Sequence, residues 1–185
     1  VLSILGLLAD NGTASGSANF CGQNLLALPE AKLRKIRGKR ISMVFQDPMT
    51  SLNPYLTIAG QMTQALRQHK KISREAAQEH CVEMLEAVKI PDARKCFDRY
   101  PHELSGGMRQ RIQLARVLAN KPRMLVMDEP FAALDAQTRS VLQEELRRIW
   151  QDHKVTVLFI THDIEEALLL GTRIGVCLLY TSPSP

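Results

Sequence analysis

Met124-Leu-Val-Met-Asp-Glu-Pro130 is the most informative stretch of this chain. A continuous apolar run that ends at turn residues is typical of a strand buried on both faces of a parallel sheet. A second such run, Val155-Thr-Val-Leu-Phe-Ile160, follows a segment with apolar residues at helical spacing, namely Leu142, Leu146, Ile149 and Trp150. The order strand, helix, strand predicts a βαβ unit, and therefore an α/β domain with a mostly parallel sheet.

Upstream of this unit, short apolar runs predict one more strand and helices before it. Ile41-Ser-Met-Val-Phe45 is rich in β-prone residues and predicts a strand. Residues 25–37 predict a helix with a basic outer face. Residues 1–8 predict the end of a helix that closes at Asn11-Gly12.

The middle of the chain is predicted to be helical. Apolar side chains recur at helical spacing over residues 58–66 and 77–88, and a third helix is predicted from Ser105 to a stop at Pro122. Because no strand pattern interrupts this block, residues from about 55 to 115 are predicted to form a helical subdomain inserted in the α/β core.

Composition places the chain among single-domain globular proteins. Its 185 residues carry a net charge of +5 and are 45% hydrophobic with only 10 Gly and 9 Pro, which excludes disordered and collagen-like classes. No apolar run approaches the roughly 18 residues of a membrane-spanning helix. Residues 1–8 are apolar but lack a basic leader, so no signal peptide is predicted, and the start without methionine predicts a fragment or a processed product.

The cysteines and the basic residues have ordinary predicted roles. No two of the four cysteines form a C-x-x-C pair, which predicts reduced thiols rather than a zinc site or a disulfide framework. The basic run over residues 32–40 contains no interleaved aromatic residue. It therefore predicts a solvated face and no nucleic-acid partner.

Polar residues follow the two strand candidates where each strand ends. Asp128 and Glu129 end one run, and Thr161-His-Asp163 follows the next. Because ligands bind at the carboxyl ends of parallel strands, these residues predict a site for a cation and a polarised water. Asp128 would hold Mg²⁺, and Glu129 would orient or deprotonate the water. The alternative is that Asp-Glu-Pro simply ends a strand with turn residues.

A second constellation is Leu104-Ser-Gly-Gly-Met-Arg-Gln110. Its two glycines let the backbone approach a ligand closely, and the amides of the helix that begins there favour a phosphate group. Ser105 adds a hydroxyl donor. The alternative is an ordinary helix start with a flexible entry.

Together these motifs resemble those of ABC transporter ATP-binding subunits, which are ATP-binding-cassette ATPases. Residues 104–110 are similar to the family's signature motif, residues 124–129 to its Walker B strand with the catalytic glutamate, and residues 133–135 to its D-loop. His162 resembles its switch histidine, and Gln46 resembles its Q-loop glutamine. The motifs stand in the family's order, and the resemblance implies a P-loop NTPase-type sheet core.

The resemblance implies a catalytic or metal-binding role for four residues. Glu129 would act as the catalytic base, His162 would contact the γ-phosphate, and Asp128 would hold Mg²⁺. Gln46 would approach both Mg²⁺ and the attacking water, while its loop reports to a membrane permease. The chemistry implied is phosphoryl transfer by positioning and charge neutralisation.

The cassettes of this family face each other head to tail, which implies contacts between subunits. ATP held mainly by the opposite subunit would contact the signature residues Ser105, Gly106, Gly107 and Gln110. Asp135 of the D-loop would sense the partner across the dimer.

The printed sequence departs from the family pattern at both ends. No G-x-x-x-x-G-K-S/T motif occurs, so the phosphate cradle and its lysine are missing. The chain alone is therefore expected to bind ATP poorly and to hydrolyse it hardly at all, and activity is assigned to the intact gene product. Residues 1–176 are predicted to be a partial ABC ATPase domain. Residues 177–185 resemble translated adapter read-through and are predicted to be a non-native or disordered tail.

Different segments of the chain resemble importers of different solutes. Residues 45–54 are similar to dipeptide and oligopeptide importer ATPases, whereas residues 128–139 and 161–167 look more like nitrate, sulfonate or taurine importers. Both groups of importer ATPases share nearly the same amino-acid sequence over residues 100–111. A natural mosaic or an assembly chimera joined in that stretch would explain the switch.

The sequence therefore predicts the ATP-binding and ATP-hydrolysing subunit of a bacterial ABC importer, truncated at both ends, with peptides as the first choice of solute. It would bind ATP and Mg²⁺ and pair with a second ATP-binding subunit. It would dock on transmembrane permease subunits at the cytoplasmic face of the membrane, through the loop after Gln46 and the helices up to Pro91. The alternatives are a nitrate-, sulfonate- or taurine-type importer ATPase, a soluble ABC ATPase of DNA repair or translation, and a non-catalytic fragment.

Overall fold

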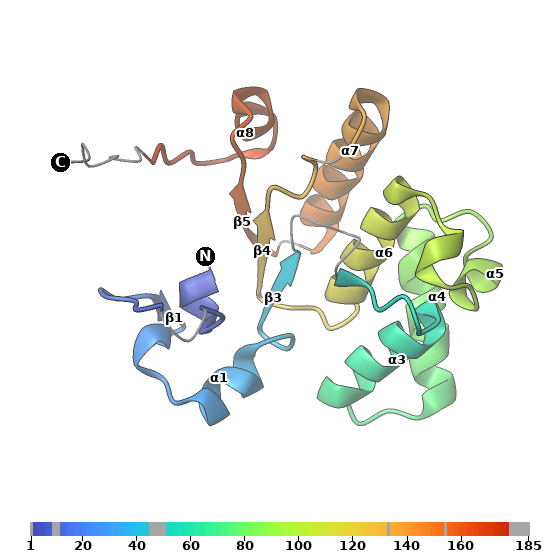
Figure 1. The fold of residues 1–185 in the computed structure, drawn as a ribbon, viewed down its shortest axis with the longest axis horizontal. Coiled ribbons are helices and arrows are strands. Elements are labelled where there is room, and N and C mark those ends of the chain that lie inside the picture. The colour runs from blue at the N-terminus through green and yellow to red at the C-terminus, as the bar shows by residue number, and fades with distance from the viewer. Residues whose placement is uncertain (1, 9–11, 45–50, 133, 154, 178–185) are drawn as a thin grey trace.

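The computed structural model of the chain describes residues 2–8, 12–44, 51–132, 134–153 and 155–177 (Figure 1). Its central sheet contains three parallel strands in the order β3 (Ile41–Val44), β4 (Met124–Asp128) and β5 (Thr156–Ile160). A short antiparallel pair, β1 (Asn19–Phe20) and β2 (Gln23–Asn24), precedes the sheet and was not predicted. The parallel order confirms the predicted α/β class.

Helices surround this sheet, and most begin at a residue whose side chain caps the first turn. The 3₁₀ helices are η1 (Leu2–Leu5), η2 (Leu25–Ala27) and η3 (Pro101–Glu103). The α-helices are α1 (Glu30–Ile36), α3 (Ile58–His69), α4 (Arg74–Ala87), α5 (Ala93–Phe97), α6 (Gly106–Leu118), α7 (Ala136–His153) and α8 (Ile164–Leu170). The side chains of Thr57, Ser73, Ser105 and Asp163 accept backbone N–H bonds at the starts of α3, α4, α6 and α8.

Two hydrophobic cores lie on opposite faces of the sheet, because the side chains of β4 alternate between them. Leu125 and Met127 belong to the larger core, which helices α3 to α7 form with the sheet. Met124 and Val126 pack into a smaller core with η1, η2 and α1. Figure 1 shows these two groups of helices on either side of the strands. Burial on both faces explains why β4 is apolar at every position before Asp128.

Pro29 divides the helix that the sequence predicts over residues 25–37. Its backbone is extended, with φ −65° and ψ 150°, and Leu28 before it is also extended. A residue before proline avoids the helical region, because the proline ring collides with its backbone and Cβ. The chain therefore forms η2 and then α1, and the prediction of one continuous helix is wrong.

Trp150 does not lie on the buried side of α7. Its side chain is 41% exposed, whereas Leu142 and Leu146 are buried. Each four-residue step along a helix turns about 40° beyond a full rotation, so Trp150 has turned about 80° away from Leu142. The predicted apolar face is therefore confirmed for the first two residues only.

The remaining local predictions concern thiols, the basic run and possible membrane spans. All four cysteines are free, as predicted. The basic side chains of residues 32–40 are mostly exposed, but Arg37 donates to Glu30 and to the carbonyl oxygen of Leu5. Gly175 to Cys177 form no strand. Within the described residues, no helix combines the length and the apolar character that crossing a membrane requires.

Candidate functional site

The candidate site begins where β4 ends. Asp128 is the last residue of β4 and lies opposite Ile160, the last residue of β5. Glu129 has φ 44°, in the left-handed region, and its N–H donates to the carbonyl oxygen of Ile160 at 2.9 Å. A non-glycine residue held in this conformation costs free energy and is typical of functional turns. The turn brings the Glu129 side chain to the carboxyl edge of the sheet.

Glu129 and His162 meet at this edge, as the sequence predicts for residues that end neighbouring parallel strands. His162 Nδ1 lies 3.3 Å from Glu129 Oε1. The histidine side chain is 75% exposed and the glutamate side chain 29% exposed. The imidazole can donate from Nδ1 to the carboxylate in one neutral tautomer and as a cation. The pair can therefore hold a proton close to an incoming ligand.

The carboxylate oxygens at this edge of the sheet suit a cation that keeps most of its coordinated water molecules. Among the residues that the structure describes, no group of three His, Cys, Asp or Glu side chains is placed to share a metal ion. Asp128 and Glu129 are partly buried carboxylates at one turn. Mg²⁺ takes oxygen ligands and is usually bound through one or two carboxylates, waters and substrate phosphates. The residues present fit that mode of binding.

The predicted signature segment lies at the start of α6. Ser105 accepts the N–H of Met108 at 3.3 Å and caps the helix. A Cβ added to Gly106 would meet no atom within 4 Å, so the backbone is open to a ligand at this residue. A Cβ added to Gly107 would lie 2.8 Å from Cγ2 of Thr138 in α7. Gly107 therefore lets the start of α6 pack closely against the first turn of α7.

Gln110 lies inside the protein, although the sequence predicts it as a contact of ATP. Its side chain is fully buried, and its Nε2 donates to the carbonyl oxygen of Pro130. Pro130 directly follows Glu129, so Gln110 ties α6 to the turn that presents the glutamate. In this structure Gln110 therefore supports that turn, and its contact with ATP stays a prediction.

Asp135 caps the first turn of α7 from an exposed position. Its Oδ1 accepts the N–H of Thr138 at 2.9 Å. Hydrogen bonds from the backbone and side chain of Thr138 hold the pKa of Asp135 below its ordinary value. Asp135 is therefore a carboxylate at neutral pH. Two predicted residues of this region, Gln46 and Ala133, lie outside the described residues.

A buried polar cluster beside His162 was missed by the sequence analysis. Glu166 is 5% exposed and accepts hydrogen bonds from Thr161 and Gln143. Arg139 adds an ion pair with Asp163. The signal in the sequence was Glu166 at the third position after Asp163, because this spacing is typical of a capping box.

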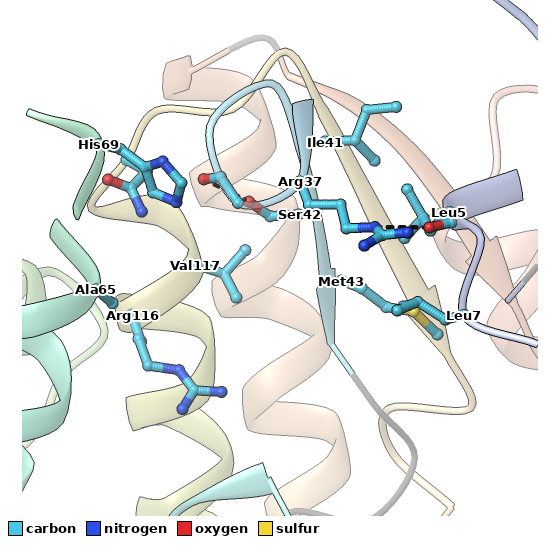
Figure 2. A pocket seen from close by; sticks show the side chains of 12 residues that line it. Leu5, Leu7, Arg37, Ile41, Ser42, Met43, Ala65, His69, Arg116 and Val117 are labelled. Atoms are coloured by element: carbon cyan, nitrogen blue, oxygen red, sulfur yellow. Dashed lines mark hydrogen bonds between the residues drawn. The ribbon is translucent and has the colours of Figure 1, made fainter. Parts of the chain in front are cut away.

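A separate cavity lies at the other end of the sheet. It has a volume of about 190 Å³ and opens beside Ile41, the first residue of β3. Figure 2 shows Arg37 crossing one side of it toward the carbonyl oxygen of Leu5, 2.7 Å from Nε, with His69 on the other side. Burial, and then the charge of Lys39, lower the pKa of His69. Asp128 ends its strand at the opposite edge, so this cavity is distinct from the candidate site.

The ABC transporter family matches residues 2–132 of the chain. The chain belongs to the ABC transporter family. This agrees with the order of elements around the Walker B strand β4 and the signature helix α6. It confirms the predicted P-loop NTPase-type α/β fold, because structural relatives of the chain are ABC cassettes.

Among solved structures, the chain is similar to the ATP-binding cassette MJ0796 in a dimeric post-hydrolysis state bound to ADP and Pi. The TM-score is 0.73 and the identity 29%, over 84% of this chain and 66% of that chain. Another dimeric structure of MJ0796 gives a TM-score of 0.67 over 79% of this chain and 62% of that chain.

Curated relatives of this ABC chain are named as oligopeptide transport ATP-binding proteins OppD. The OppD of Salmonella typhimurium is 45% identical over 175 residues, which cover 95% of this chain and 50% of the relative. The OppD of Bacillus subtilis is 42% identical, over 87% of this chain and 45% of the relative. The chain thus spans about half the length of the curated relatives it matches.

Proposed function

We propose that this chain is part of the ATP-binding and ATP-hydrolysing subunit of an ABC importer that takes up peptides. The observation that carries the proposal is the contact between Glu129 and His162 at the carboxyl ends of two neighbouring strands, in a chain of this family. The names of the OppD relatives support peptides as the solute.

In this proposal, residues at the end of β4 position and activate the water that attacks ATP. Glu129 accepts a proton from the attacking water, and the hydrogen bond of its backbone to Ile160 holds the turn that carries its side chain. Asp128 would hold Mg²⁺, and the bound ion would neutralise charge on the phosphate groups. Gln46 is assigned to the same metal and water, and it lies outside the described residues.

His162 is assigned to the γ-phosphate of ATP. Because its Nδ1 faces Glu129, Nε2 is the ring nitrogen that we assign to a phosphate oxygen. A hydrogen bond on each side of the ring would hold the phosphate and the carboxylate at a set separation. The role is one of positioning and charge stabilisation, as phosphoryl transfer requires.

The signature segment is assigned to a second ATP bound mainly by another ATP-binding subunit. Ser105, Gly106 and Gly107 stand at the start of α6, where the helix dipole and unpaired amides favour a phosphate. The open space at Gly106 supports this assignment. Asp135 is assigned to contact across the dimer, and the dimeric structures of MJ0796 support pairing with a second cassette.

The proposed partners also include transmembrane permease subunits at the cytoplasmic face of the membrane, where the protein would be peripheral. The loop after Gln46 and the helices up to Pro91 are assigned as the surface that docks on them. A groove of about 790 Å³ between α3 and α4, lined in part by Arg67, Lys71 and Arg74, lies on these helices. Residues 1–176 remain our proposed partial ABC ATPase domain.

A nitrate-, sulfonate- or taurine-type importer is the second candidate, and the amino-acid sequence of residues 128–139 favours it. The OppD relative of Salmonella typhimurium aligns over 95% of the chain, so its match also includes most of that part. Transport assays with the full-length protein and its permease decide between labelled peptides and these anions.

The test of the ATPase proposal is Glu129→Gln in the full-length source protein. Because a general base contributes about 10²–10⁴-fold, kcat for ATP hydrolysis should fall by at least about 100-fold while nucleotide binding is retained. Glu144→Gln is the matched control, because Glu144 is exposed on α7 and its ion pair with Arg147 spans 3.9 Å. Hydrolysis at the wild-type rate in Glu129→Gln would show that Glu129 is not the base.

A further inference from the structure

We propose that Arg139 is a positioning residue that sets the geometry of His162 by joining the His162 turn to the D-loop turn through the buried carboxylate of Glu166. This inference rests on the proposed ATPase function. It assigns a role to a residue outside the motifs that suggested that function.

Glu166 is the centre of the cluster. Its side chain is only 7% exposed, and both of its oxygens have partners. Oε2 accepts the Thr161 hydroxyl at 2.7 Å, and Oε1 accepts Nε2 of Gln143 at 3.2 Å. A buried carboxylate is costly unless it is paired with a cation and hydrogen-bonded. The cation beside it is Arg139, whose Nε lies 3.9 Å from Oε1.

The guanidinium of Arg139 reaches three segments at once. Nη1 lies 3.4 Å from Oδ2 of Asp163, and Nη2 donates to the carbonyl oxygen of Leu134 at 3.2 Å. With the contact to Glu166, the side chain spans the D-loop turn, the turn after β5 and the first turn of α8. A planar guanidinium offers donors in fixed directions, which the single ammonium group of a lysine does not.

The residues on both sides of His162 are held by this cluster. Thr161 donates to Glu166, and its Oγ1 accepts the N–H of Asp163 at 2.9 Å. Asp163 in turn accepts the N–H groups of Glu165 and Glu166. His162 itself is 75% exposed, so packing of its ring does little to orient it. Its direction toward Glu129 therefore depends on the backbone that Thr161 and Asp163 fix.

The same guanidinium also holds the D-loop turn, because it binds Leu134, the residue before Asp135. A shift of the D-loop would move Arg139 and, through Glu166 and Asp163, the segment that carries His162. The cluster thus links the residue assigned to the dimer partner with the residue assigned to the γ-phosphate. Arg139 does not touch the reacting atoms in this proposal, so it acts only by positioning.

The test compares Arg139→Gln and Arg139→Lys with Arg147→Gln in the full-length source protein. Arg147 lies on the same helix, and its ion pair with Glu144 spans 3.9 Å. Both Arg139 variants should lower kcat for ATP hydrolysis about 10- to 100-fold with KM changed less than about 3-fold, because a small misplacement costs up to about 100-fold. Arg147→Gln should hydrolyse ATP at the wild-type rate.

A double variant separates positioning of His162 from a general effect on the fold. In a His162→Ala background, Arg139→Gln should cause less than about a 2-fold further loss in single-turnover hydrolysis, because residues that act as a unit are not additive. A full 10- to 100-fold further loss would overturn the inference, and so would Arg139→Gln at the wild-type kcat. Should Arg139→Gln fail to fold, the same two measurements are made on Thr161→Val, which removes the hydroxyl that joins Glu166 to the N–H of Asp163.

The two proposals fail in different ways. A wild-type protein without ATPase activity, or a Glu129→Gln variant at full rate, would reject the proposed function. A wild-type protein that hydrolyses ATP and loses activity in Glu129→Gln, but not in Arg139→Gln, would reject the positioning role of Arg139 alone.

Discussion

The Nδ1 atom of His162 lies 3.3 Å from the Oε1 atom of Glu129, although helix α7 and strand β5 separate the two residues along the chain. The contact follows from the register of the sheet. Asp128 pairs with Ile160, so Glu129 and His162 both come just after paired strand ends. The N–H of Glu129 also donates to the carbonyl oxygen of Ile160. A shift of one residue in this register would turn every strand side chain to the other face and separate the pair.

The two signature glycines should differ sharply in their tolerance of alanine. In Gly107→Ala the new Cβ would lie 2.8 Å from Cγ2 of Thr138, and the collision should lower the free energy of unfolding by about 1 kcal/mol or more. Gly106→Ala is the matched control: its Cβ meets open space, so the change should stay within about 0.5 kcal/mol. Urea denaturation of the full-length protein measures both.

A second substitution tests the cause of the Gly107 effect. Thr138→Ser removes Cγ2 and keeps the hydroxyl, so it should recover most of the stability that Gly107→Ala loses. Equal losses in the single and double variants would show that the close packing of α6 on α7 is not the cause.

Gln110 should matter for stability through the carbonyl group of Pro130. Gln110→Met keeps the approximate length of the side chain but removes the donor, which leaves a buried carbonyl oxygen without that partner. The expected cost is about 1–3 kcal/mol of unfolding free energy. Gln137→Met, at an exposed position of α7, is the control and should change stability by less than about 0.5 kcal/mol. Identical denaturation midpoints for the two variants would refute this role of Gln110.

The stability of the protein should fall at alkaline pH because of Cys81. Burial raises the pKa of this thiol from 9.0 to about 11, against the opposing effects of the Thr63 hydrogen bond and the Lys70 charge. Below pH 9 the thiol is protonated in both the folded and the unfolded states. As the pH rises from 9 to about 11, the unfolded state loses the proton more readily, so the folded state loses relative stability.

The difference between wild type and Cys81→Ala removes the contribution of titrating groups that do not interact with Cys81, whereas the charge of Lys70 is coupled to this thiol. Unfolding free energies measured at intervals across this pH range should decline less steeply in the variant. Parallel declines would mean that Cys81 does not titrate with a raised pKa.

Local features of the fold were predictable because they depend on local physics. The buried strand β4 is apolar at each position before Asp128, and the capped helix α6 begins at Ser105 where the glycine pair predicts it. Pro29 misled the helix prediction because apolar spacing continues across a residue that cannot join the helix there. Trp150 misled it because a spacing of four drifts around the helix axis.

The candidate site was predictable only in part. The motifs identified Asp128, Glu129 and His162, because residues at the carboxyl ends of parallel strands meet at one edge. Gln110 was assigned to the nucleotide from its place in a motif, although its side chain is directed inward to Pro130. No spacing in the sequence predicts that Arg139 would reach Leu134, Asp163 and Glu166 together.

The sequence by itself thus determined the family, the order of the three parallel strands, and the residue types at the strand ends, because these depend on apolar periodicity and motif order. The tertiary structure alone decided which side chains meet. The contact of His162 with Glu129, the packing of Gly107 on Thr138 and the buried pairing of Glu166 all join segments that are distant in the chain. Their geometry depends on sheet register and helix packing, which come from the whole core rather than from any one segment.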